Sequence, residues 1–443
     1  MKGTLLIKNG IVITLGENNR VLHNHHVIIE DGKISKITDT IPSDLKFDKE
    51  IDAAGKLIMP GFINAHMHFY STLVRGLGKA EPAHNFQEVL ENLWWRLDKK
   101  LSMEDNYYSA LVMMIQSIKC GTTTLIDHHA SPGAVKGSLM EIAKAVTETG
   151  LRSSLCYELS DRDGKEIAQQ GLEENEEFIK YCADNDKGFL KAMFGLHASF
   201  TVGEETLIKA SEIGNKYNSG FHVHVAEDMS DQNATRDKYG LSVVERFRDF
   251  KILGKKSIAA HCIHIDEAEM DMLAETNTIV THQPQSNMNN AVGISDIIKM
   301  QEKGILVGLG TDAMTVNMLE EVRTAMWAQH LRNADPSVGF MEVVNTLFFN
   351  NAKIANRFWD QKLGVIEEDA VADIVLLDYY SPTPLNEGTV LGHFIFGLSN
   401  AKVDTTIVNG RVLMENQILK IDIDEREVNA KAAEAAQKLW DRF

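Results

Sequence analysis

Short apolar runs alternate with longer amphipathic stretches from about Pro60 to about residue 357. The short runs have the length of buried strands, whereas the apolar residues of the longer stretches recur at helical spacing. This alternation predicts β-strand and α-helix units around a parallel sheet. Eight such units predict an α/β fold with a closed (β/α)8 barrel of the TIM type, and an open doubly wound sheet is the alternative. The predicted strands are 61–65, 122–127, 151–157, 190–196, 220–225, 257–261, 278–282 and 305–310.

The two ends of the chain alternate apolar and polar residues, as short antiparallel strands do. Residues 4–15 and 26–38 show this pattern, with Asn-Gly and Asp-Gly pairs where turns are expected. The same pattern returns at 372–378 and 405–412. We therefore expect the two ends to share one small domain. The predicted domains are a β-sandwich from residues 1–58 and 358–425, a barrel over 59–357 and a C-terminal helix over 426–443.

Composition and charge narrow the classes of partner. The 443 residues are 44% hydrophobic and 24% charged, which allows one large core and a smaller satellite domain. The net charge of −18 disfavours binding to nucleic acid or to an anionic membrane, both of which require clustered Lys and Arg. The first apolar run is too short for a signal peptide or a membrane span. We expect a cytoplasmic protein whose partners are small molecules.

The first strand of the predicted barrel ends in two histidines separated by one residue, His66 and His68. Residues i and i+2 of a strand face the same side, so both imidazoles can bind one cation. The simpler alternative is that they are two polar residues at a strand end that bind no cation. The pair alone is weak support for a metal site.

Three later strand ends carry residues suited to the same chemistry. His224 ends the fifth strand and Glu227 follows it as a candidate acid/base, although a solvated Glu beside a hydrogen-bonded histidine is equally compatible. His261 ends the sixth strand, and His264 lies a turn beyond it. Asp312 follows the eighth strand, where it can bind a metal, accept a proton from water or merely cap a helix. Barrel enzymes carry their catalytic groups at this end of their strands, so the sequence predicts a hydrolytic metal site there.

The order of these motifs resembles the amidohydrolase superfamily, in particular its guanine, cytosine, S-adenosylhomocysteine and triazine deaminases and chlorohydrolases. The likeness covers nearly the whole chain, including the closing pattern at 363–367 and Ala372-Asp373, with Ala370 where many relatives carry glycine. Segments 127–131 and 157–164 resemble those of aminohydrolases associated with selenium metabolism.

The resemblance implies a mononuclear metal site. Binuclear relatives have a carbamylated lysine at the end of strand four, where this chain has Gly195-Leu196-His197-Ala198. Imidazole and carboxylate ligands favour zinc, and iron or manganese fit the same set. The implied metal ligands are His66, His68, His224 and Asp312, and the implied catalytic residues are Glu227, His261 and Asp312, with His264 a weaker match than His261.

The resemblance also implies four substrate contacts, which are His197, Asp98, His129 and Asn287. Asp98 lies in a long polar helix, where an aspartate is usually solvated, and either His128 or His129 can face the pocket. Glu158 and Arg162 follow the third strand and border the pocket, although such a loop is more often a surface turn. Helix 86–119 is expected to form a subunit interface or to cover the pocket.

The implied activity is hydrolytic deamination of a purine, a pyrimidine or a related ring by metal-activated hydroxide. One alternative is hydrolysis of another carbon–nitrogen bond or of a carbon–halogen bond at the same metal. A second is a catalytically silent barrel that acts as a binding protein, which the filled catalytic positions disfavour. A homo-oligomer is expected, because closed homo-oligomers are common among soluble enzymes.

Overall fold

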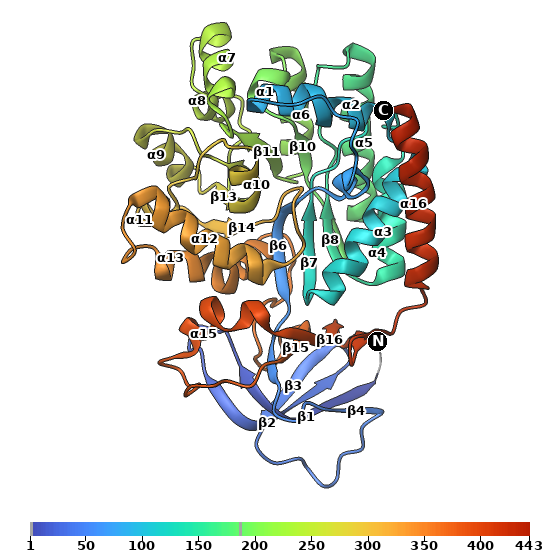
Figure 1. Cartoon of the computed structure of the whole chain (residues 1–443), viewed down its shortest axis with the longest axis vertical. Coiled ribbons are helices and arrows are strands. Elements are labelled where there is room, and N and C mark those ends of the chain that lie inside the picture. Colours follow the sequence, from blue (N-terminus) through green and yellow to red (C-terminus); the bar gives the residue numbers. More distant parts are fainter. Residues whose placement is uncertain (1–2, 186–187) are drawn as a thin grey trace.

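The structure is a computed structural model that describes residues 3–185 and 188–443. It consists of a large α/β part and a smaller β part, whose strands come from both ends of the chain (Figure 1). None of the described helices is long and apolar enough to cross a bilayer.

The α/β part is built on two parallel sheets, with orders β6-β7-β8-β9 and β10-β11-β12-β13-β14. Their edges meet twice, because Met67 bridges Asp312 and Leu159 bridges Leu196, both in parallel. Every predicted strand position holds a strand, and 190–196 holds two that are separated by Met193. The bounds are β6 Phe62–Met67, β7 Thr122–Asp127, β8 Arg152–Leu155, β9 Leu190–Ala192, β10 Phe194–Leu196, β11 Phe221–Val225, β12 Ile258–His261, β13 Ile279–His282 and β14 Val307–Leu309.

Helices follow most of these strands and cover the sheets from outside (Figure 1). The segment predicted as one helix over 86–119 is interrupted, with short helical turns before a regular α3. The bounds are α1 Phe86–Val89, α2 Trp95–Leu97, α3 Met103–Lys119, α4 Ser138–Thr149, α5 Lys165–Asp184, α6 Glu204–Lys216, α7 Met229–Tyr239, α8 Val243–Asp249, α9 Glu267–Glu275, α10 Pro284–Asn289, α11 Ile297–Glu302, α12 Met318–Asn333, α13 Phe340–Asn345, α14 Asn351–Ala355, α15 Val390–Phe396 and α16 Glu425–Arg442.

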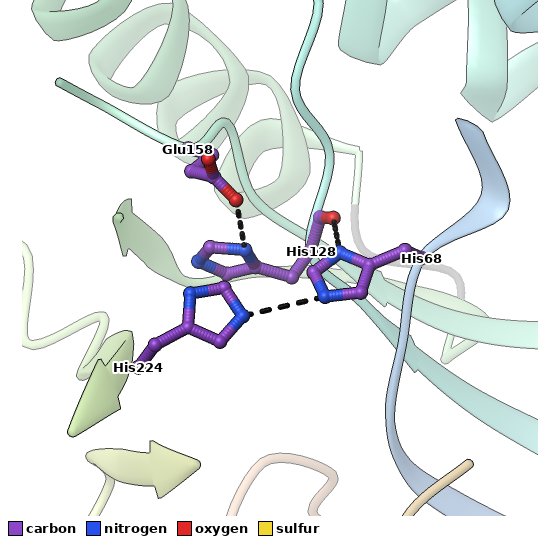
Figure 2. Close-up of side chains that lie close together, drawn as sticks. All are labelled: His68, His128, Glu158 and His224. Atoms are coloured by element: carbon purple, nitrogen blue, oxygen red, sulfur yellow. Dashed lines mark hydrogen bonds and ion pairs between the residues drawn. The ribbon is translucent and has the colours of Figure 1, made fainter. Parts of the chain in front are cut away.

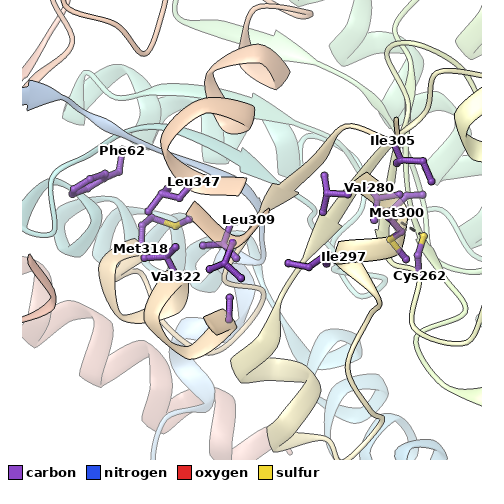
Figure 3. Close-up of a cluster of buried hydrophobic side chains, with 14 of the residues drawn as sticks. Phe62, Cys262, Val280, Ile297, Met300, Ile305, Leu309, Met318, Val322 and Leu347 are labelled. Atoms are coloured by element: carbon purple, nitrogen blue, oxygen red, sulfur yellow. Dashed lines mark hydrogen bonds between the residues drawn. The ribbon is translucent and has the colours of Figure 1, made fainter. Parts of the chain in front are cut away.

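The packing between β14 and its helices fixes the end of that strand. Val280 of β13, Leu309 of β14, Ile297 of α11 and Val322 of α12 are fully buried in one cluster (Figure 3). Full burial of such a side chain contributes about 1.5–3 kcal/mol. This cluster holds β14 in register, and with it the position of Asp312 just beyond the strand.

The two ends of the chain share one nine-stranded sheet, as the alternating pattern predicts, whereas its closure into a sandwich stays a prediction. Its order is β18-β17-β16-β15-β5-β1-β2-β3, with β4 beside β1. The antiparallel pair β5–β15 joins the N-terminal strands to the C-terminal ones. The bounds are β1 Thr4–Ile13, β2 Val21–Glu30, β3 Lys33–Thr38, β4 Lys49–Asp52, β5 Leu57–Pro60, β15 Ile374–Asp378, β16 Lys402–Val408, β17 Arg411–Glu415 and β18 Ile418–Leu419.

A buried ion pair joins the two parts. Arg152 of β8 is 1% exposed and pairs with Asp373, which immediately precedes β15. Asp373 also accepts a hydrogen bond from the backbone of Asn409. Removal of the guanidinium would leave the carboxylate buried without a cation.

We therefore expect Arg152→Ala to lower the free energy of unfolding by about 3–5 kcal/mol, the usual cost of breaking a buried pair. Lys49→Ala is the control, because its pair with Glu415 lies at the surface, with the Lys49 side chain 41% exposed, and should contribute less than about 1 kcal/mol. Urea denaturation of the two variants measures the difference. Equal losses would show that the buried pair is not a joint between the two parts.

Candidate metal centre and active site

Four histidines and one aspartate meet at the carboxyl ends of the parallel strands. They are His66 of β6, His68 directly after it, His224 of β11, His261 of β12 and Asp312 after β14, and all are buried. His68 Nε2 lies 3.1 Å from Asp312 Oδ1 and 3.3 Å from His224 Nε2. His261 Nε2 lies 3.6 Å from Asp312 Oδ2. The structure thus brings together every residue predicted as a metal ligand.

Hydrogen bonds fix which nitrogen of His68 and His224 faces the centre. His68 Nδ1 lies 2.6 Å from the carbonyl oxygen of His128 (Figure 2), and His224 Nδ1 lies 2.9 Å from that of His197. A carbonyl oxygen only accepts, so each Nδ1 carries a hydrogen and donates it. Nε2 of both rings is the nitrogen available to a cation, and carbonyl acceptors behind metal-binding histidines commonly fix the ring in this way.

His66 and His261 complete the donor set. His66 Nδ1 shares a hydrogen bond of 2.8 Å with His222 Nε2, and His261 Nδ1 lies 2.8 Å from Asn287 Oδ1. Among the described residues, Nε2 of His66 and Nε2 of His261 are buried without a hydrogen-bond partner. Unpartnered imidazole nitrogens that converge on a carboxylate fit a divalent transition-metal ion.

Burial and neighbouring groups shift the pKa values of these residues. Burial, with help from nearby imidazoles, holds the pKa of His66 and of His224 well below its usual range, so both rings are neutral. Burial opposes ionisation of His68, but its hydrogen bond with Asp312 raises its pKa to about 9. Burial acts to raise the pKa of Asp312, but the same hydrogen bond with His68 acts in the opposite direction, and the pKa is lowered. A cation bound here therefore displaces a proton from His68.

Glu227 lies beside this donor set, two residues beyond β11. Its Oε2 is 3.5 Å from His261 Nε2, and its Oε1 accepts a hydrogen bond of 3.4 Å from Asn290. Burial raises its pKa to about 7. A carboxyl group of this pKa can both accept and donate a proton near neutral pH.

The backbone at three of these strand ends is left-handed without glycine. Ala226 has φ 45°, His261 has φ 72° and Asp312 has φ 55°. Such conformations cost about 1–3 kcal/mol each and persist where the surrounding structure fixes them, often at functional sites. Here they turn the chain sharply after β11, β12 and β14 and direct Glu227 and Asp312 to the same centre.

A pocket opens from the centre and has an aromatic wall. Trp94 and Trp95, from the segment predicted to form an interface or cover the pocket, line it together with Phe86, Tyr70 and Phe200. Flat aromatic side chains of this kind suit a planar ring.

A buried ion pair lies at the edge of the pocket. Asp98 is 2% exposed and pairs with Arg162, whose guanidinium also lies 5.4 Å from the ring centre of Trp95. Burial raises the pKa of Asp98 to about 7. Its Oδ1 has no hydrogen-bond partner among the described residues. Asp98, which lines the pocket, therefore offers an acceptor to a molecule bound there.

His128 and Glu158 form a further polar pair beside His68 and His224 (Figure 2). His128 Nδ1 lies 3.1 Å from Glu158 Oε2, and both side chains are buried. Burial opposes ionisation of Glu158, but nearby imidazoles, His197 first, hold its pKa well below its usual range. Glu158 is thus a glutamate that lines the pocket in addition to Glu227.

Of the four predicted substrate contacts, two line the pocket and two do not. His197 and Asp98 line the pocket, and Asp98 is not solvated as a polar helix would suggest. His129 is not among the lining residues, because its ring bonds Ser131. Asn287 contacts His261 and lies behind the pocket wall. The remaining candidate ligand, His264, bonds the backbone of Val292 at 2.7 Å, away from the centre.

Sequence reasoning assigned no role to Glu158 and Arg162. The sequence placed both residues beside the pocket. However, a loop of acidic and basic residues is more often a surface turn, and that interpretation was favoured. The position of Glu158 three residues beyond a strand of the sheet is the signal that could have found it, since Asp312 also lies three residues beyond its strand.

A profile of the Amidohydrolase family matches residues 57–413, which include all of these groups. The chain belongs to the amidohydrolase family. Curated relatives of the family match almost its entire length. It is 33% identical to a 5'-deoxyadenosine deaminase of Methanosarcina acetivorans over 444 residues, 98% of each chain. It is also 33% identical to a 5-methylthioadenosine/S-adenosylhomocysteine deaminase of Halothermothrix orenii, over 98% of this chain and 99% of that one.

Solved structures of deaminases share the fold. An adenosine deaminase from Xanthomonas campestris with bound zinc superposes with a TM-score of 0.86 at 21% identity, over 98% of each chain. The guanine deaminase of E. coli gives a TM-score of 0.78 at 20% identity, over 94% of this chain and 100% of that one. The resemblance to the deaminase branch of this superfamily is confirmed.

Proposed function

We propose that this amidohydrolase is a metal-dependent hydrolytic deaminase of an amino-substituted nitrogen heterocycle. The observation that carries the proposal is the convergence of three imidazole Nε2 atoms and Asp312 beside Glu227, below an aromatic wall. Relatives with 33% identity over nearly the whole chain are named as deaminases of adenosine derivatives, which supports a purine nucleoside as the substrate.

We also propose how the chain is divided. The parallel sheets would close into one (β/α)8 barrel over residues 59–357, since their edges are already bridged at both junctions. Residues 1–58 and 358–425 would form the β-sandwich domain, and 426–443 the C-terminal helix. The TM-score of 0.86 with a solved deaminase supports this division.

The proposed metal is a single zinc ion held by His66, His68, His224 and Asp312. The bound zinc of the Xanthomonas campestris deaminase supports this choice, as does a donor set of imidazoles and one carboxylate. When bound, such an ion makes hydroxide available from water near neutral pH.

The residues of the chain would then handle protons and position the ring. Glu227 accepts a proton from water and delivers it to the ring nitrogen, and later supplies the proton that the departing amine needs. His261, held by Asn287, orients the attacking oxygen together with Asp312. His197 and Asp98 contact the substrate from the pocket wall.

The proposal is tested by ammonia release from a panel of amino-heterocycles. We expect zinc-loaded protein to release ammonia from 5'-deoxyadenosine, 5-methylthioadenosine, guanine or cytosine, with purine nucleosides the best substrates. Ammonia is measured by coupled glutamate dehydrogenase. Turnover of chloro-substituted rings without ammonia from any amine would favour hydrolysis of carbon–halogen bonds instead.

The pH dependence of kcat/KM should reflect the ionisation of Glu227. Because burial raises its pKa to about 7, the carboxylate that accepts the proton from water is lost as the pH falls below that value. We expect kcat/KM to fall about tenfold per pH unit on the acidic side. A profile that is flat from pH 5 to pH 7 would contradict this role.

A cytoplasmic homo-oligomer remains part of the proposal. Trp327 and Leu331 on α12 and Phe396 on the adjacent α15 are large apolar side chains that are more than half exposed. Exposed apolar residues of this kind are typical of protein interfaces. Light scattering after size exclusion should give a mass of at least two chains.

A further inference from the structure

Glu158 is a pocket carboxylate that the proposed function does not use. Its side chain is 4% exposed, lines the pocket and comes from beyond β8, whereas Glu227 comes from beyond β11. The two carboxylates thus reach the pocket from different strands. Figure 2 shows the Glu158 carboxylate directed toward His128, close to His68 and His224.

The orientation of Glu158 is fixed by a ring that is itself anchored. His128 Nε2 lies 3.1 Å from the carbonyl oxygens of Leu196 and His222. Both carbonyls only accept, so Nε2 carries a hydrogen and the ring cannot turn without losing both bonds. Its Nδ1 therefore faces Glu158 Oε2 at 3.1 Å, and the two form an ion pair when both ring nitrogens carry a hydrogen.

The other oxygen of Glu158 is available to a ligand. Oε1 has His197 Nε2 as a neighbour at 3.8 Å, which is too long for a hydrogen bond. Because Glu158 lines the pocket, a bound molecule that carries an N–H can donate it to this oxygen. The pocket is therefore built for a ligand with a donor at this position.

The planar geometry of an amidine carbon indicates which donor this is. The carbon has three substituents about 120° apart: the ring nitrogen, the rest of the ring and the amino group. If the ring nitrogen faces Glu227 and the ring packs against Trp94 and Trp95, the amino group is the substituent left to face the third strand, where Glu158 lies.

We propose that Glu158 accepts an N–H hydrogen bond from the amino group that is released, and thereby selects amines over chloride or alkoxide leaving groups. The inference rests on the proposed function. A fixed anion favours an N–H donor and the departing ammonia, and it repels the lone pairs of chlorine or of an ether oxygen.

The reaction balances without a proton transfer to Glu158. A carbon–oxygen bond forms from water, and the carbon–nitrogen bond breaks with its electron pair on nitrogen. Of the two hydrogens of water, one ends on the ring nitrogen and the other on ammonia. Glu158 only accepts a hydrogen bond throughout.

The test compares leaving groups on one ring, that of the best substrate in the ammonia panel. For a purine nucleoside the probes are adenosine, 6-methoxypurine riboside and 6-chloropurine riboside, assayed with zinc-loaded wild type and Glu158→Gln. Glu174→Gln is the matched control, since Glu174 is also buried but bonds the backbone of Gly137 and Leu139 away from the pocket. Zinc content is measured for all three proteins.

We expect wild type to prefer the amine over the methoxy analogue by at least about 100-fold, as sites built to bind an N–H do. Glu158→Gln should lower kcat/KM for the amine by about 100-fold and leave the methoxy analogue within about threefold, because the Gln amide can donate to the ether oxygen. Zinc content should not change, and Glu174→Gln should keep the wild-type preference.

Two results would overturn the inference. Ammonia release with an amine preference that is the same in wild type and Glu158→Gln removes the role of Glu158 and leaves the deaminase proposal intact. Faster release of chloride or methanol than of ammonia by wild type also overturns it. No ammonia from any amine in the panel contradicts the proposed function itself.

Discussion

Glu227→Gln should lower kcat for ammonia release by about 10³-fold, because general acid–base catalysis contributes 10²–10⁴ and Gln can neither accept nor deliver the proton. The amide has the same shape and can keep its contact with Asn290, so the fold and the cation site should survive. Steady-state kinetics of the zinc-loaded variant measure the loss.

The control for Glu227→Gln is Glu205→Gln, at a side chain that is 75% exposed on α6. It should retain wild-type kcat. Zinc content must stay at the wild-type level in both variants, since a loss of metal would produce the same drop in rate for a different reason. A Glu227→Gln protein with full zinc and near-normal kcat would remove the proposed acid/base.

His66→Ala should abolish tight zinc binding. Its Nε2 is one of the buried nitrogens without a hydrogen-bond partner among the described residues, and alanine offers no nitrogen in its place. A bound ligand stabilises the folded state by about 4 kcal/mol at a thousand times its Kd. Wild type should therefore unfold at a higher temperature with zinc than after chelation, and the variant should show no such difference.

Elemental analysis and thermal unfolding of His66→Ala are read against His84→Ala, at an exposed histidine outside the pocket. That control should bind zinc as wild type does. If His66→Ala also retained stoichiometric zinc, the cation would lie elsewhere and the donor set described above would be wrong.

The positions of most strands could be predicted from the sequence because they are buried apolar runs. Residues of parallel strands are covered on both faces, so strands such as β12 and β14 are largely apolar, whereas β7 is equally buried but contains three threonines and an aspartate. The histidines that end such runs could be predicted for the same reason. His66, His68, His224 and Asp312 stand out because they are polar residues directly after apolar segments.

The rest of the pocket depends on contacts that no local pattern encodes. Asp98 looks like a solvated helix residue until Arg162, 64 positions away, is placed beside it. The choice between His128 and His129 depends on carbonyls from two other strands, which hold the His128 ring, whereas His129 bonds Ser131. The broken helix around Trp94 likewise follows from its position above the pocket.

The most direct test of the deaminase account is turnover of the best amino substrate in water enriched in ¹⁸O, with ammonia and product mass measured together. The account predicts one ¹⁸O in the carbonyl product for each ammonia released, and formation of both products slowed about 10³-fold in Glu227→Gln. Turnover by wild type without ammonia, or ammonia without ¹⁸O in the product, would contradict hydrolytic deamination at this site.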